Sequence, residues 1–201
     1  KTLSEWRTCF ADWIDVPNPD ALLNCSVFFD LEGVWGNVAW ADDLYQFIVN
    51  RAQKTPKFLA SLARNALLRT PPLGFFKEFV MEQDGAHRRT INLKRRGTAP
   101  LVDVIRVHAL AIGSRARNSS ERLEDVIESG ILPDKRGQEL KYALEYLAMV
   151  RIRYQAEDVE SGEEVDKTIE PDKLSDIERR NLKEAFNVLR SSQRFLKYRY
   201  P

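Results

Sequence analysis

The sequence is poor in the residues that build metal, redox and covalent catalytic sites. Its 201 residues include two cysteines, Cys9 and Cys25, and two histidines, His87 and His108. Structural zinc sites take four Cys or His ligands, normally as closely spaced pairs, and this sequence has no such pair. The sequence therefore excludes a structural zinc site and predicts two reduced thiols packed near helices, as in cytosolic proteins.

Long apolar runs are also missing, and neither sign of charge dominates. No stretch approaches the roughly 20 apolar residues that cross a bilayer, and no secretory signal is present. We therefore expect a cytoplasmic protein without a membrane partner. Lys and Arg total 31 against 30 Asp and Glu, so no overall field attracts nucleic acid. Aromatic residues do not alternate with the basic ones, which also argues against nucleic-acid binding.

Common catalytic motifs are absent. There is no Gly-x-Ser-x-Gly elbow, no phosphate-binding P-loop and no metal-binding His pair, so catalysis by this chain alone is not expected. Gly113-Ser114 followed by Glu124-Asp125 has a superficial similarity to a Gly-Ser motif with paired metal-binding acids. Such acids must alternate on a strand, whereas neighbouring residues on a helix point about 100° apart. We interpret these residues as a loop and a helix cap.

Helical periodicity is the main signal that the sequence does contain. At 43% hydrophobic residues the chain can bury the core of one large domain or two small ones. Apolar residues recur at helical spacing through most of its length. The pattern predicts a mainly α-helical bundle, with helices over residues 3–14, 20–33, 40–54, 56–67, 101–112, 119–129, 138–157 and 174–198. The second of these helices ends at Gly33 or Gly36, and its apolar run 26–31 has a strand as the alternative.

One region has the shorter period of a β-strand. Between residues 78 and 94, Asp84-Gly85 is a hairpin turn signal, and Ile91 and Leu93 alternate with polar residues. The sequence therefore predicts a small β-hairpin near residues 78–94. Because two strands alone are marginally stable, we expect this hairpin to lie on a helical surface. The acidic segment 158–171 is expected to be an exposed loop.

A basic connector joins the hairpin to the next predicted helix. Lys94, Arg95 and Arg96 lie in a short extended run, and the helix that follows carries Asp103 and Arg106. Cations beside the free N–H groups of a helix start favour a phosphate-bearing ligand. The alternative is a solvated charged turn, with Asp103 and Arg106 paired three residues apart on the helix surface.

Polar residues on the apolar faces of the last two helices predict a second feature. Arg151 and Glu178 are each in register with buried positions. Because unpartnered buried charges are costly, these side chains are expected to share a polar network, for example as an Arg151–Glu178 pair. A ligand-facing role is the alternative. His87 is interpreted as a surface residue.

Several ordered blocks resemble a known family. The most specific is Leu93-Lys94-x-x-Gly97-x-x-Pro100-Leu101-Val102-Asp103-x-x-Arg106. Further blocks are Ala21–Leu31, Ser120-Glu121-Arg122-Leu123, Arg151-Ile152-Arg153-Tyr154-Gln155 and Glu178-Arg179-x-x-Leu182-Lys183. Together they resemble the C-terminal, substrate-binding region of bacterial nucleotidyltransferases associated with CBS and cyclic-nucleotide-binding domains, which are relatives of protein-PII uridylyltransferase.

The resemblance implies that catalysis and substrate binding belong to different parts of the protein. Residues 1–40 would be the tail of a nucleotidyltransferase core that lies upstream of Lys1, and residues 41–201 would form a helical substrate-binding domain. Mg²⁺ and a nucleoside triphosphate would belong to that core, and this chain alone would be inactive. The domain would help to bind the nucleotide, or the protein or small-molecule acceptor. Lys94, Arg95 and Arg96 would contact phosphate, while Asp103 and Arg106 would position the connector.

The resemblance also suggests partners and a competing function. The expected partners are the core, the CBS or cyclic-nucleotide-binding domains and a protein substrate, with a homodimer left open. The alternative function is a non-catalytic regulatory domain that relays signals from upstream sensor domains through protein contacts. One segment departs from the family: Lys167-Thr168-Ile169-Glu170-Pro171 replaces an Asn and an Asp that commonly precede this proline. The resemblance therefore assigns no role to that loop.

Overall fold

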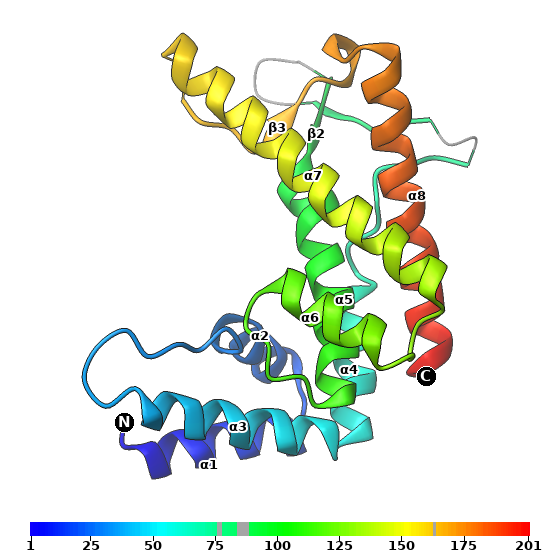
Figure 1. The fold of residues 1–201 in the computed structure, drawn as a ribbon. Coiled ribbons are helices and arrows are strands. Elements are labelled where there is room, and N and C mark those ends of the chain that lie inside the picture. Colours follow the sequence, from blue (N-terminus) through cyan, green and yellow to red (C-terminus); the bar gives the residue numbers. More distant parts are fainter. Residues whose placement is uncertain (76–77, 84–88, 163) are drawn as a thin grey trace. The chain divides into compact units, whose positions relative to one another are not determined.

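A computed structural model describes residues 1–75, 78–83, 89–162 and 164–201. Over these residues the protein is mainly α-helical with a small antiparallel sheet, which confirms the predicted fold class (Figure 1). The chain forms two compact units. Unit 1 contains residues 1–66, 104–134 and 196–201, and unit 2 contains residues 67–103 and 135–195. Among the described residues, no helix combines the length and the apolar character of a membrane span.

Unit 1 is built from helices. They are α1 (Leu3–Asp15), α2 (Pro19–Phe28), α3 (Ala39–Gln53), α4 (Pro56–Ala66), the second part of α5 (Ala99–Ile112) and α6 (Ser119–Glu128). The helical period places apolar side chains on one face of each helix, and those faces form the core. Its largest buried side chains include Phe10, Ile14, Phe29, Ile48 and Phe58.

The local start and stop signals of unit 1 agree with the sequence in most places. Asn118 followed three residues later by Glu121 predicts a capped helix start, and Asn118 does cap α6 by accepting a hydrogen bond from the Glu121 N–H at 2.9 Å. Helix α2, however, is capped by Asn18, which accepts from Ala21 N–H at 2.8 Å. The sequence pattern predicts Asp20 as the cap of this helix, and that prediction is wrong, because Pro19 takes the first helical position and the cap is Asn18, two residues earlier.

The residues that superficially resemble a metal-binding motif are structural. Gly113 ends α5 with a φ of +75°, a conformation that favours glycine. Ser114 Oγ donates a hydrogen bond to the carboxylate of Asp125 on α6. This contact ties the loop to the helix and confirms the interpretation as loop and cap.

Unit 2 combines two long helices with the sheet. Apart from helix ends that fall in unit 1, it contains β1 (Glu82–Gln83), β2 (Arg89–Asn92), the π-helical turn η1 (Lys94–Thr98), α7 (Asp134–Ser161), β3 (Thr168–Ile169), the 3₁₀ turn η2 (Pro171–Lys173) and α8 (Asp176–Arg199). Buried residues of its core include Ile91, Leu93, Leu140, Leu147, Leu182 and Phe186.

The sheet confirms the hairpin and adds a strand. Glu82 pairs with Thr90 in antiparallel register, whereas the predicted Asp84-Gly85 turn and His87 lie outside the described residues. On the other edge of β2, Ile91 pairs with Ile169 of β3. The predicted exposed loop over residues 158–171 is therefore only partly correct. Helix α7 continues to residue 161, and a two-residue strand then joins the sheet.

The connector after β2 is helical rather than extended. The Ala99 N–H donates to the carbonyl of Lys94, five residues back, so the turn is wider than an α-helix. Pro100 has no N–H, and its ring would clash with the Arg96 carbonyl in a regular α-helix. The wide turn relieves that clash. The predictions of an extended connector and of a helix that starts at Leu101 are therefore wrong.

Candidate functional site

The predicted basic residues lie together on the π-helical turn η1. Lys94 is exposed at its start. Arg95 forms an ion pair with Glu82, and Arg96 reaches the same carboxylate at 3.2 Å. Arg96 Nε also donates to the carbonyl of Thr70 at 2.8 Å. We call Lys94, Arg95 and Arg96 the basic turn. Arg95 and Arg96 share the Glu82 carboxylate, so the basic turn together with Glu82 has a formal charge of +2.

The other two predicted site residues are placed differently. Asp103 lies 4.0 Å from Arg69, and its side chain is 22% exposed. Arg106 belongs to unit 1, where it is 8% exposed and pairs with Asp30 at 3.0 Å. Burial of this kind fits a structural ion pair better than a ligand contact. Whether Asp103 and Arg106 pair with one another stays a prediction.

Asp30 is also bound by a second buried arginine. Arg122 is 4% exposed and contacts Asp30 at 2.8 Å. Its Nε donates to the Ala116 carbonyl at 2.9 Å, and its Nη2 donates to the Tyr45 hydroxyl at 3.2 Å. Asp30 itself remains 51% exposed. The sequence gives no sign of this pairing, because Asp30 and Arg122 are distant in the chain.

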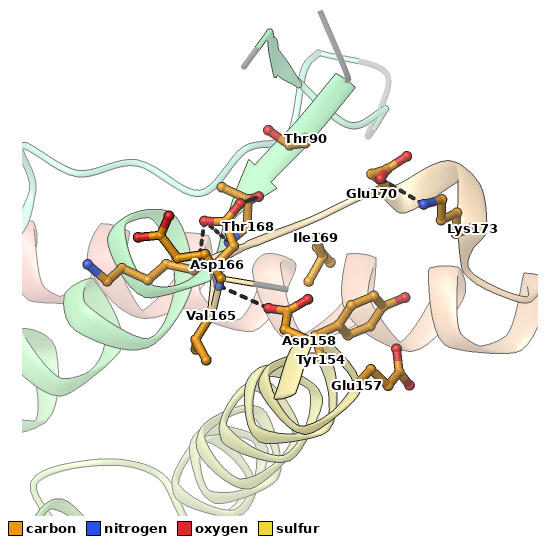
Figure 2. Close-up of a pocket in the computed structure, with 12 residues that line it drawn as sticks. Thr90, Tyr154, Glu157, Asp158, Val165, Asp166, Thr168, Ile169, Glu170 and Lys173 are labelled. Carbon is orange, nitrogen blue, oxygen red and sulfur yellow. Dashed lines mark hydrogen bonds and ion pairs between the residues drawn. The ribbon is translucent and has the colours of Figure 1, made fainter. Parts of the chain in front are cut away.

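A cavity of about 530 Å³ lies in unit 2 beside β3. Its wall comes from the end of α7, the segment around β3, the turn η2 and one residue of β2, as Figure 2 shows. The lining residues are Thr90, Tyr154, Glu157, Asp158, Glu164, Val165, Asp166, Lys167, Thr168, Ile169, Glu170 and Lys173. We call it the acidic cavity, because its five carboxylates and two lysines give a formal charge of −3.

Hydrogen bonds within the wall hold the segment around β3 in place. The Asp166 N–H donates to the Asp158 carboxylate at 2.9 Å, which ties the segment to α7. The Asp166 carboxylate accepts from the Thr168 N–H at 3.3 Å. Lys173 binds Glu170 at 2.8 Å (Figure 2). Asp158 and Asp166 therefore position the loop, whereas the Glu157 side chain is 58% exposed and its carboxylate lies 3.7 Å from Arg153 Nε.

The chemistry of the cavity favours positively charged ligands. A volume near 530 Å³ suits a small molecule or one side chain of a larger partner. Burial and the neighbouring Glu157 raise the pKa of Tyr154, although Arg153 opposes this, so its phenol stays protonated at neutral pH. The surrounding carboxylates would repel phosphate groups. Among the described residues, no group of three or more Cys, His, Asp or Glu side chains is arranged to hold a metal.

The predicted polar network between α7 and α8 exists, with a different arginine. Glu178 pairs with Arg153 at 2.6 Å, whereas Arg151 donates to Thr98 Oγ1 at 3.3 Å. The prediction of an Arg151–Glu178 pair is therefore wrong, because the two arginines lie on different faces of α7. Hydrogen bonds from the N–H and hydroxyl of Ser175, followed by the Arg153 contact, lower the pKa of Glu178 to about 2.

Sequence reasoning located the basic turn but missed the acidic cavity. The one available signal was the density of Asp and Glu between residues 157 and 170. The sequence predicts an exposed loop over that segment, and its departure from the family pattern leaves it without an assigned role. The structure shows that it forms most of the cavity wall.

Comparison with known proteins gives a family match. A family described as "Putative nucleotidyltransferase substrate binding domain" matches residues 56–200. The match includes the basic turn and every residue that lines the acidic cavity, and it confirms the resemblance found in the sequence. No curated protein and no solved structure gives a significant match.

Proposed function

We propose that this chain, which belongs to the family of nucleotidyltransferase substrate-binding domains, binds a substrate of nucleotidyl transfer to a protein or small acceptor. The family match over residues 56–200 is the observation that carries this proposal. A nucleotidyltransferase core elsewhere would carry out the reaction and hold Mg²⁺ and the nucleoside triphosphate. The described residues do not fit a metal site, and no step of the proposal runs through a metal ion.

The basic turn is proposed to contact the phosphates of the nucleotide. Lys94 is exposed, and the Arg95 side chain is 55% exposed, so both are accessible to a ligand. Glu82 neutralises part of the charge and would compete with an incoming phosphate. Arg96 is only 24% exposed and supports the Thr70 backbone, so its first role is to hold the turn.

Two substitutions are expected to shift triphosphate affinity in opposite directions. Lys94→Ala should raise the dissociation constant of ATP or UTP roughly tenfold, because it removes one charge-assisted contact. Glu82→Gln should lower it, because the competing carboxylate becomes neutral. Isothermal titration calorimetry at low salt would measure both constants.

Lys135→Ala is the matched control, because it removes a similarly exposed lysine at the start of α7. Its dissociation constant should equal that of the wild type. Equal affinities for the wild type and Lys94→Ala, with both proteins folded, would contradict phosphate binding by the basic turn.

The acidic cavity is proposed to hold a positively charged group of the acceptor. Its formal charge of −3 disfavours the triphosphate and favours an amine or guanidinium. Glu157 and Tyr154 lie on the same wall, at the end of α7 (Figure 2). They would supply a carboxylate acceptor and a protonated phenol to one ligand.

Charge reversal in the cavity is expected to weaken the binding of a cation. Glu157→Lys should weaken the binding of spermidine, a simple cationic probe, by roughly tenfold, because it replaces an attraction with a repulsion. Two-dimensional NMR titration of this chain would measure the constant and locate the shifted resonances. Glu160→Lys, an exposed residue of the same helix outside the cavity wall, is the control. Spermidine binding that both variants weaken equally would show a non-specific charge effect and reject the cavity.

A further inference from the structure

One face of α7 is apolar although the described chain leaves it uncovered. Tyr142 is 43% exposed, Met149 51%, Ile152 60% and Val159 64%. The opposite face of the same helix carries the buried core residues Leu140, Ala143, Leu147 and Val150. Four large apolar side chains on one exposed helix face are unusual, since scattered single ones are the norm. We call these four residues the α7 stripe.

The spacing of the stripe is that of a helix-pairing seam. Met149 follows Tyr142 by seven residues, Ile152 follows Met149 by three, and Val159 follows Ile152 by seven. This alternation keeps the side chains on one line of the helix and is the pattern by which two helices interlock. Glu145 is the single polar residue among the seam positions between Tyr142 and Val159, and Ala156 is small. A packing surface for another helix has this pattern.

The stripe is also self-complementary. The midpoint of Tyr142 and Val159 along the sequence lies between residues 150 and 151. Met149 and Ile152 have the same midpoint. In an antiparallel pair of identical helices that crosses at this centre, Tyr142 would meet Val159 of the other copy, and Met149 would meet Ile152. A two-fold interface requires this correspondence, because the same patch must fit itself.

The side chain of Tyr142 is already fixed by its neighbours in the position that such a contact needs. Its ring stacks on Tyr146, with centroids 5.8 Å apart and an interplanar angle of 15°. The Tyr146 hydroxyl donates to the Glu178 carbonyl of α8 at 3.1 Å, which anchors the pair. A fixed aromatic side chain loses little conformational entropy on binding, so it is a favourable interface anchor.

We propose that the α7 stripe is a homodimer interface in which α7 pairs antiparallel with α7 of a second copy. The seam from Tyr142 to Val159 is about 26 Å long. It is shorter than the three to four heptads of a stable coiled coil, so the dimer is expected to be weak, with a dissociation constant on the order of tens of micromolar.

Sedimentation equilibrium over about a hundredfold range of concentration around that constant tests the proposal. The wild type should change from monomer to dimer within the range. Ile152→Glu should weaken the dimer by more than about tenfold, because each copy places a carboxylate in the seam. Ile177→Glu, which changes an isoleucine on α8 that is 70% exposed against 60% for Ile152, should leave the dimer unchanged. Met149→Glu is the second seam variant if Ile152→Glu fails to fold.

Cysteine pairing tests the direction of the helices. In a Cys9→Ser background, with Cys25 buried, Met149→Cys and Ile152→Cys proteins of different mass would be mixed and oxidised. An antiparallel seam gives mainly the mixed disulfide, whereas a parallel one gives mainly the two homodimers. A wild type that stays monomeric throughout, a dimer indifferent to both seam variants, or a majority of homodisulfides would each overturn the proposal.

Discussion

Replacing Gly97 with valine is expected to lower the free energy of unfolding by about 3 kcal/mol, near the upper end for an overpacked core. A Cβ at Gly97 would lie 3.3 Å from Phe186 Cε1 and 3.4 Å from Leu147 Cδ1. The two methyl groups of valine would extend further toward side chains that are themselves fully buried. Because the interior is close-packed, α7 and α8, which carry Leu147 and Phe186, would have to move away from η1. Chemical denaturation followed by circular dichroism would measure the loss.

Gly97→Ala and Gly74→Val make this prediction specific. Alanine at Gly97 adds only the Cβ, whose nearest neighbour would lie at 3.3 Å. The cost of this close contact is offset by a gain of about 1 kcal/mol in helix propensity, so we expect nearly unchanged stability. At Gly74 a Cβ would meet its nearest neighbour at an ordinary 3.6 Å, so the same valine substitution should cost little. A Gly97→Val protein with the wild-type denaturation midpoint would show that α7 and α8 do not pack on this turn.

Replacing Arg122 with methionine is expected to destabilise unit 1 by about 3 kcal/mol, the lower end for breaking a buried ion pair. The substitution removes the donor to the Ala116 carbonyl and the donor to the Tyr45 hydroxyl. It also removes one of the two arginines on Asp30. Asp30 is half exposed and can recover hydration, which keeps the loss below that of a fully buried pair. Thermal unfolding followed by circular dichroism measures the effect.

Arg115→Met is the matched control for this experiment. Arg115 precedes α6 in the same segment and is exposed, so its loss should change the thermal midpoint by less than a few degrees. If Arg122→Met and Arg115→Met unfold together with the wild type, the contacts of Arg122 contribute no net stability. Triphosphate binding should be unaffected in both variants, because neither residue belongs to the basic turn.

These contacts give a physical reason for much of the block that resembles the family. Gly97 allows close packing of η1 against Leu147 and Phe186. Pro100 accompanies the wide helical turn. Arg106 binds Asp30 inside unit 1. Lys94 alone among these positions is exposed, so it is the position of the block most open to a ligand.

The sequence by itself determined the elements whose signals are local. The helical period, the Asn118 cap and the Pro56 helix start each act within one or two turns, so most helices could be predicted within a few residues. Alternation around Ile91 likewise identified β2. The basic turn was found because its three cations are contiguous, although its helical geometry was not.

Tertiary structure alone decided which distant residues meet. Strand β3 has two residues, too few to show alternation, and its register on β2 depends on packing. The choice of Arg153 over Arg151 for Glu178 depends on the rotation of α7 against α8. The acidic cavity requires the chain after α7 to turn back along its end, and the α7 stripe is recognisable only once the buried face of α7 is known. Periodicity shows that a helix has faces, whereas which face is covered depends on the neighbours that the fold provides.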